Sequence, residues 1–363
     1  MSLSARPKNP TKRHPFGSAH FWIATTTCCI VAILILAAPY VSIVLSDTEP
    51  MIAIRYVPPK PKLNRADYDA RLLVLANNPP VATTTASTTK FLWPAKTVYP
   101  NSGALLPFNR IVAYYGNFYS TQMGVLGQYP ASVMLGKLAN EVAEWEEVDP
   151  TTPVVPAIDY IAVTAQAGPG PSGKYRFRMP DKEIDHALEL ATEVKGIVIL
   201  DIQVGLSDLK TEIPQFEKYL KMPQVHLAVD PEFSMKTGDA PGTVIGVFDA
   251  SDVNYAADYL SELVNRYDLP PKILIIHRFT KDMVTHYRHI APLPQVQIVM
   301  DMDGWGSPQK KRATYEKVVY EEPVQFAGLK LFYKNDLLPP SPSMLTKKEA
   351  LELKPRPIFI QYQ

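Results

Sequence analysis

From Arg110 onward, short apolar runs alternate with segments of helical periodicity, and this alternation constrains the fold more than any other feature. The runs lie at 110–116, 154–162, 196–205, 225–233, 243–248, 272–279, 296–304 and 328–333. Helical patterns separate most of them, at 133–147, 181–195, 208–221, 250–267, 280–290 and 308–321. Continuous Val, Ile and Leu strands that alternate with amphipathic helices indicate a parallel sheet covered by helices.

Eight such units in about 250 residues predict an α/β fold, a (β/α)8 TIM-type barrel, over residues 109–363. A doubly wound open sheet is the alternative. The fourth unit fits the barrel least well, because residues 234–242 have the composition of a loop rather than of a helix.

The N-terminal segment predicts a membrane anchor. Residues 21–45 are uncharged and mostly apolar, which is long enough for a helix to cross a hydrocarbon core of about 30 Å. Basic residues precede this segment and acidic residues follow it. The positive-inside rule then predicts a single-pass plasma membrane protein. Residues 1–20 form its cytoplasmic basic tail, and the barrel lies on the extracytoplasmic side. A cleaved signal peptide is the alternative, but its apolar region would usually span only about 7–15 residues.

Residues 46–108 are expected to form an extracytoplasmic linker or stalk. Proline pairs and a Thr/Ser/Ala run at 82–89 favour an extended, solvated spacer over a packed core. Within this segment, residues 65–76 are predicted to form a short helix that docks on the following domain.

Charge and cysteine content exclude some classes of partner. The chain has 37 basic and 36 acidic residues, so no global positive field favours nucleic acid. Its two cysteines, Cys28 and Cys29, are adjacent and imply neither a structural disulfide nor a zinc site. The expected partners are the lipid bilayer, through residues 21–45, and the substrate discussed below.

Polar residues gather where the predicted strands end, which is where barrel enzymes build their active sites. Three strand ends carry an Asp-x-[Gln/Glu/Asp] pattern, whose two polar side chains share one face of the strand. A buried Asp without a partner costs several kcal/mol, so this repetition indicates a shared acidic pocket rather than separate caps and salt bridges. The polar and aromatic residues at these ends are Tyr114, Tyr115, Asp159, Asp201, Gln203, Asp230, Glu232, His277, Arg278, Asp301, Asp303, Trp305, Lys330 and Tyr333.

Two opposed carboxyl groups around one pocket are what glycoside hydrolysis requires. Glu232 lies beside Phe233 and near Asp230, a setting that predicts a raised pKa and the role of general acid. Asp303 is expected across the barrel as the opposing carboxylate, with Asp301 and Asp201 as the alternatives. The predicted substrate is a polysaccharide or cell-envelope glycan, and the reaction requires no metal or other cofactor. The predicted substrate-binding residues are Asp201, Gln203, Asp230, His277, Asp301, Trp305, Tyr114 and Tyr333.

A resemblance to known barrels rests on six motifs. The stretches AYYGNFYSTQMGVLGQYP, ILDIQVG, LAVDPEF, IIHRFTKDMV, MDMDGWGSPQKKRATY and GLKLFYKND resemble a family of uncharacterised bacterial exported or lipoprotein-like barrels over about residues 105–363. The wider barrel resembles glycoside hydrolases in placing a Glu, here Glu232, at the end of strand four. It differs from their best-known clan in having Pro231 where an Asn is usual, and Asp303 on the predicted strand seven where that clan has Glu.

Two other functions remain open from the sequence. The acidic cluster is rich in oxygen ligands and has one imidazole, His277, which suits Mg, Mn or Ca and a metal-dependent hydrolase. A non-catalytic glycan- or envelope-binding module is the other alternative. A phosphate-binding loop is excluded at 168–175, because Pro169 and Pro171 lack the N–H groups that should hold phosphate and Tyr175 replaces the magnesium-binding hydroxyl.

Overall fold

The computed structural model describes residues 62–79, 90–95 and 97–363. The centre of this described part is a closed barrel of eight parallel strands, in which the first strand pairs with both the second and the last. A short antiparallel strand, β3 (Arg176–Arg178), extends the sheet from the end of β2. The barrel strands are β1 (Arg110–Gly116), β2 (Val154–Ala165), β4 (Ile197–Ile202), β5 (Val225–Val229), β7 (Lys272–Arg278), β9 (Val296–Met302), β10 (Phe326–Leu331) and β11 (Phe359–Tyr362). This confirms the predicted TIM-type barrel.

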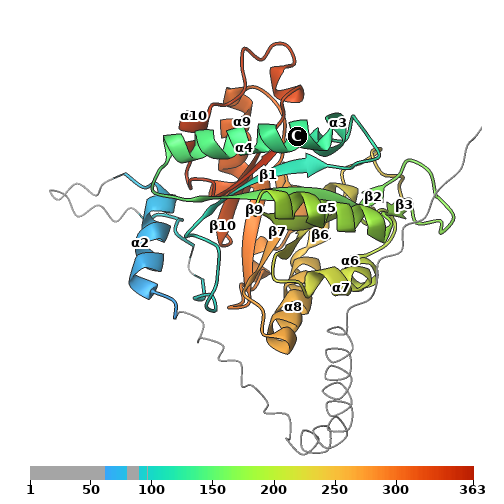
Figure 1. The fold of residues 1–363 in the computed structure, drawn as a ribbon, viewed down its shortest axis with the longest axis horizontal. Helices are drawn as coiled ribbons and strands as arrows, with labels where there is room; N and C mark the ends of the chain where they lie inside the picture. Colours follow the sequence, from blue (N-terminus) through green and yellow to red (C-terminus); the bar gives the residue numbers. More distant parts are fainter. Residues whose placement is uncertain (1–61, 80–89, 96) are drawn as a thin grey trace, which may run out of the picture. The chain divides into compact units, whose positions relative to one another are not determined.

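Helices lie on the outside of the strands, as Figure 1 shows. The longest are α4 (Ala131–Val148), α5 (Asp181–Glu193) and α8 (Ala250–Tyr267). The predicted helix at 208–221 is divided into α6 (Leu209–Glu212), a 3₁₀ turn that contains Pro214, and α7 (Glu217–Leu220). The remaining helices are α2 (Arg65–Ala76), α3 (Val125–Gln128), α9 (Pro308–Tyr315), which continues as a π-helical turn to Tyr320, and α10 (Lys347–Leu351).

Two predicted elements are wrong. Residues 243–247 form a loop, and Phe248–Asp249 (β6) pairs only with Val284–Thr285 (β8), outside the barrel. The predicted helix at 280–290 consists of β8 between two 3₁₀ turns, Lys281–Met283 and Tyr287–His289. The missing barrel strand is β11, which completes the barrel between β1 and β10.

The core has two parts because the side chains of each strand alternate between two faces. Side chains on the outer face, such as Val112 and Leu200, pack against the helices. Those on the inner face, such as Ile111 and Ile275, fill the barrel towards the amino ends of its strands. Tyr68 of α2 belongs to this inner cluster, so the predicted docking of this helix is confirmed.

The described part of the predicted linker packs on the barrel rather than forming an extended spacer. The described residues from 62 onward cluster as one compact unit, and Tyr68, Trp93 and Leu106 are buried. The side chain of Gln297 donates to the backbone O of Leu106 at 2.6 Å and accepts from its N at 3.1 Å. These three apolar side chains of the proline-rich segment therefore belong to the core.

The predicted anchor at 21–45 lies outside the described residues. Within the part of the chain that the structure describes, no helix has the length and apolarity needed to cross a membrane.

Candidate active site

A cavity of about 520 Å³ opens at the carboxyl ends of the barrel strands. Its charged and polar walls come from strands that are far apart in sequence, so only the closed barrel brings them together. The lining residues are Tyr115, Gln122, Met123, Ile161, Ala165, Gln203, Asp230, Glu232, Phe233, Phe279, Asp303, Gly304, Trp305, Lys310, Thr314, Lys330, Phe332 and Gln363.

The Asp230–Glu232 turn both caps a helix and faces the cavity. Asp230 is extended (φ −114°, ψ 100°), as a residue before proline prefers. Its Oδ1 accepts from the backbone N of Glu232 at 3.0 Å, and its Oδ2 accepts from Gln203 Nε2 at 3.4 Å. The turn is also packed closely by Gly246, where an added Cβ would lie 2.5 Å from the backbone O of Pro231.

Glu232 and Asp303 share this cavity, and each has a raised pKa. Burial is the main cause of the raised pKa of Glu232, and the charge of Asp303 adds to it. Burial also raises the pKa of Asp303, while the positive charges of His277 and Lys330 oppose the rise. Glu232 is half-buried and Asp303 is 8% exposed, so a ligand in the cavity can reach both. The sequence predicts that the two carboxyl groups share one pocket, with Asp303 across the barrel. In the structure only β7 lies between β5 and β9, the strands that they follow.

Beneath the cavity lies a fully buried ionic cluster centred on His277. Its Nδ1 is 3.0 Å from Asp301 Oδ2, and its Nε2 is 3.3 Å from Asp201 Oδ2. Burial alone would lower the pKa of His277, but these two carboxylates raise it well above its ordinary value. The imidazole is therefore held as a cation between two carboxylates.

Asp159 completes this buried layer. Gln361 Nε2 donates to Asp159 Oδ2 at 2.6 Å. Burial, together with the nearby charge of Asp201, raises the pKa of Asp159 to about 8. The predicted binding residues Asp201, His277 and Asp301 therefore belong to the layer that supports the cavity and do not line it.

Two of the predicted binding residues lie elsewhere. Tyr114 points to the outer face of the barrel, where its hydroxyl lies 3.0 Å from that of Tyr333. Tyr333 donates in turn to Glu141 of α4 at 2.7 Å. Neither tyrosine lines the cavity, so the structure does not bring these two predicted binding residues to it. The inward-facing residue of β1 is Tyr115, which the alternation of the strand would have identified.

The missing strand also changes the position of Asp303. Because residues 243–248 are not a barrel strand, β9 is the sixth strand of the barrel and Asp303 follows the sixth strand rather than the seventh. The seventh is β10, whose inward residue at the cavity is Lys330. The apparent match of Asp303 to a strand-seven carboxylate is therefore wrong, although Asp303 and Glu232 still meet in one cavity.

Within the described residues, no group of three or more His, Cys, Asp or Glu side chains is arranged to hold a metal ion.

No family model matches the sequence, and no curated protein matches it. Among solved structures, the chain is distantly similar to a ruminal GH26 endo-β-1,4-mannanase, with 13% identity over 70% of this chain and a TM-score of 0.33. The chain covers 58% of that structure, less than two thirds of its length. It is also distantly similar to GH26C from Muricauda sp. MAR_2010_75, with 11% identity, 81% of each chain covered and a TM-score of 0.32.

Proposed function

We propose that the barrel hydrolyses glycosidic bonds in an extracellular or cell-envelope polysaccharide, with Glu232 and Asp303 as the catalytic pair. The observation that carries the proposal is that two carboxyl groups with raised pKa values face one cavity at the carboxyl ends of the strands. Glycoside hydrolysis requires one carboxylic acid that keeps its proton and a second group that is ionised.

The surroundings of the two carboxyl groups support different roles. The pKa of Glu232 is raised by burial and by the charge of Asp303, which favours the protonated form that can donate to the leaving oxygen. Asp303 has the cations of His277 and Lys330 nearby, which favour its ionised form. The ionised Asp303 therefore stabilises the positive charge that develops on the sugar. It acts either as the nucleophile or as the base that activates water.

Aromatic side chains supply a surface for sugar rings at the opening of the cavity. Trp305 is 46% exposed and follows β9 two residues after Asp303. Phe233 and Phe279 are half-buried and line the same cavity. Apolar faces with polar groups between them are suited to a saccharide, whose rings have apolar faces and hydroxyl edges.

The test uses the purified full chain and a panel of cell-envelope and extracellular glycans, with new reducing ends as the readout. Glu232→Gln and Asp303→Asn should each lower kcat by about 10²-fold or more, and a chelator should leave turnover unchanged. Glu316→Gln, which neutralises an exposed carboxylate outside the cavity, is the matched control. Turnover that survives both cavity substitutions would contradict the proposal. Turnover lost on chelation would favour a metal-dependent hydrolase, and binding without turnover would favour a glycan-binding module.

We also propose that residues 21–45 anchor the barrel outside the plasma membrane, with the N-terminus in the cytoplasm. The support is the long uncharged segment flanked by basic residues before it and acidic residues after it. Protease added to intact cells should then degrade the barrel and leave the N-terminal segment with the membrane fraction. Protection of the barrel until the cells are lysed would contradict this location.

A further inference from the structure

We propose that the cavity recognises an acidic sugar, a uronate, and that Lys330 is the residue that binds its carboxylate. The inference rests on the proposed function and specifies the substrate class of the same site. It starts from a buried ammonium group at the cavity that the acid–base chemistry does not use. In the described part of the chain this group has no hydrogen-bond acceptor and no ion-pair partner.

The side chains of three buried lysines show the contrast. Lys272 Nζ donates to the backbone O of Met222 at 2.5 Å and of Val225 at 2.9 Å. Lys311 Nζ donates to two backbone oxygens, at 3.0 and 2.7 Å, and pairs with Asp336 at 3.1 Å. These two ammonium groups are structural because their donors are used within the fold.

Lys330 is different. It is 4% exposed and lines the cavity, yet its Nζ has no acceptor at hydrogen-bond distance and no carboxylate at ion-pair distance among the residues that the structure describes. Its Nζ contacts two aromatic rings, those of Tyr115 and Phe332, whose centroids lie 3.7 and 5.2 Å away. Removing an ammonium group from water costs several kcal/mol unless a partner compensates. The three N–H donors of Lys330 are therefore available to a ligand.

The cations of the cavity lining favour an anionic ligand over a neutral one. The charged lining residues are Asp230, Glu232, Asp303, Lys310 and Lys330. Burial raises the pKa of Asp230 well above its ordinary value, and Glu232 must be protonated to act as the acid. The two ammonium groups of this lining, Lys310 and Lys330, can each pair with a carboxylate on the substrate.

The position of Lys330 places this recognition at the reacting sugar. Lys330 lines the same cavity as Glu232 and Asp303, so a carboxylate bound to Lys330 belongs to a sugar unit beside the bond that is cleaved. Lys310 lies on the exposed part of the lining, with its Nζ 4.6 Å from the centroid of the Trp305 ring. A second uronate in the same chain could reach this cation while its ring contacts the tryptophan.

The experiment compares oligomers of galacturonate, glucuronate, mannuronate and guluronate with their carboxyl-reduced neutral counterparts. Binding is measured by calorimetry in the full chain with Glu232→Gln, so that no oligomer is consumed. At least one acidic oligomer should bind about tenfold or more tightly than its neutral counterpart, and added salt should weaken only the acidic one. Adding Lys330→Met should reduce the preference to about one. Lys317→Met, which removes an exposed lysine outside the cavity, should leave it unchanged.

Several results would overturn the inference: equal binding of acidic and neutral oligomers, binding of no acidic oligomer, or an equal loss of both in Lys330→Met. Thermal unfolding of each variant shows whether a loss of binding reflects a loss of folding. If the inference is correct but the proposed function is wrong, an acidic oligomer would bind in a Lys330-dependent way and the wild type would not cleave it. Cleavage of neutral glycans that is unaffected by Lys330→Met would retain the proposed function and reject the uronate.

Discussion

The buried layer below the cavity connects single residues to the pH dependence of stability. Asp159 has a pKa of about 8 in the folded chain, against 3.8 as its ordinary value. The folded state therefore binds more protons than the unfolded state between these two values, and the free energy of unfolding falls as the pH rises through this window. His277, whose pKa is also raised, contributes a loss of stability in the same direction above pH 6.5.

Asp159→Asn should flatten this dependence because the amide does not ionise. The slope that the substitution removes is at most about 1.4 kcal/mol per pH unit. Denaturant unfolding at pH 5 and pH 8 should show a smaller difference for the variant than for the wild type. The slope contributed by His277 should remain in both, so identical slopes in the two proteins would show that Asp159 is ionised throughout.

Adjacent tyrosines of β1 should respond differently to the same chemical change. Tyr114→Phe removes a hydrogen bond on the outer face of the barrel and should cost about 1 kcal/mol of stability without changing kcat/KM. Tyr115→Phe removes the bond from Gln203 inside the barrel and should lower kcat/KM several-fold. Denaturation and steady-state kinetics on both variants check this prediction. Equal kinetic effects would mean that the two side chains are not separated by the sheet.

Sequence could identify much of the site at the residue scale. The Asp-x-[Gln/Glu/Asp] ends place Glu232, Asp303, Gln203 and Asp230 at the cavity, because the carboxyl ends of parallel strands meet at one rim. Sequence could not show that Lys330 lacks a partner within the described residues, since this depends on distances between strands. Gln361 was missed because its strand was not recognised.

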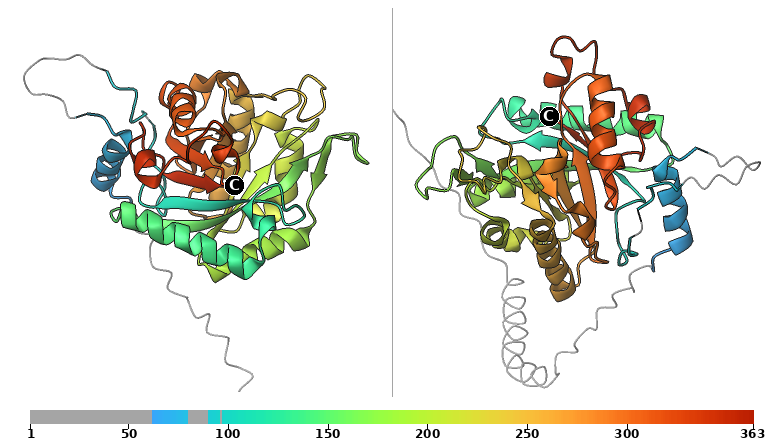
Figure 2. Two further views of the ribbon diagram at one scale, coloured as in Figure 1. Left: turned by 90° about the horizontal axis from the view of Figure 1, so that it is seen from above. Right: turned by 180° about the vertical axis from the view of Figure 1, so that it is seen from behind.

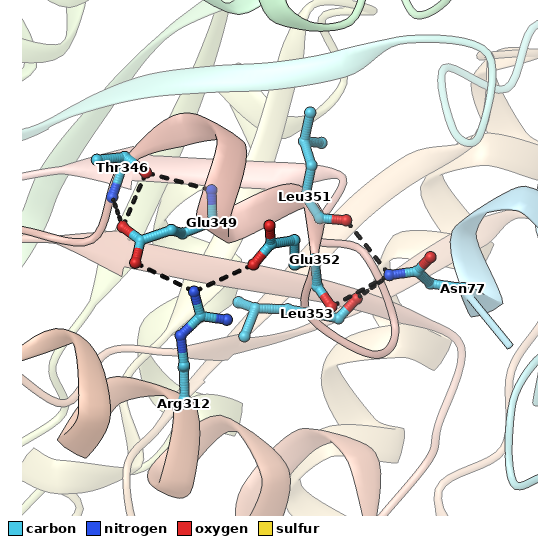
Figure 3. A network of polar contacts seen from close by, with 7 residues as sticks. All are labelled: Asn77, Arg312, Thr346, Glu349, Leu351, Glu352 and Leu353. Atoms are coloured by element: carbon cyan, nitrogen blue, oxygen red, sulfur yellow. Dashed lines mark hydrogen bonds and ion pairs between the residues drawn. The ribbon is translucent and has the colours of Figure 1, made fainter. Parts of the chain in front are cut away.

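At the scale of single elements, α2 is fixed to the barrel by the residue that ends it. Asn77 has a left-handed backbone conformation (φ 53°). Its Nδ2 donates to three successive backbone oxygens at 3.3, 3.2 and 2.9 Å, those of Leu351, Glu352 and Leu353. Figure 3 shows these contacts beside the ion pairs of Arg312 with Glu349 and Glu352. The helix end is thus joined to the segment that leads into β11.

Asn77→Ala should destabilise the domain by about 2 kcal/mol, because it removes the amide and places Ala in a left-handed conformation. Asn77→Gly is the matched control, since it removes the same amide but tolerates the backbone conformation. Denaturant unfolding should therefore give a smaller loss for Gly than for Ala. Equal losses would assign the whole effect to the amide.

The two misassigned segments show why element prediction fails in places. Residues 243–248 are apolar enough for a strand, but the tight approach of Gly246 to the Asp230–Glu232 turn holds residues 243–247 as a loop. The strand at 359–362 is only four residues long and follows a proline-rich segment, so its periodicity is too short to detect. Pairing with β1 and β10 identifies it as a strand, and such partners are visible only in the assembled barrel.

At the scale of the whole molecule, closure depends on this short strand. Without β11, both β1 and β10 would lose a parallel partner and expose open edges. Figure 2 shows β1 beside the C-terminal strand in two further views. A chain that lacks residues 359–363 should therefore lose its cooperative unfolding transition and aggregate, whereas a chain that lacks only Gln363 should fold. Circular dichroism and size-exclusion chromatography test this, and a truncated chain that unfolds like the wild type would contradict it.

The pairing of β1 with β11 also sets the order in which the barrel can form during synthesis. β1 leaves the ribosome first among the barrel strands, but one of its two neighbours is translated last of all eight. Until then the growing chain presents an incomplete sheet whose two edges can pair with other chains. The nascent protein therefore needs protection from aggregation for most of its translation, whichever side of the membrane it finally occupies.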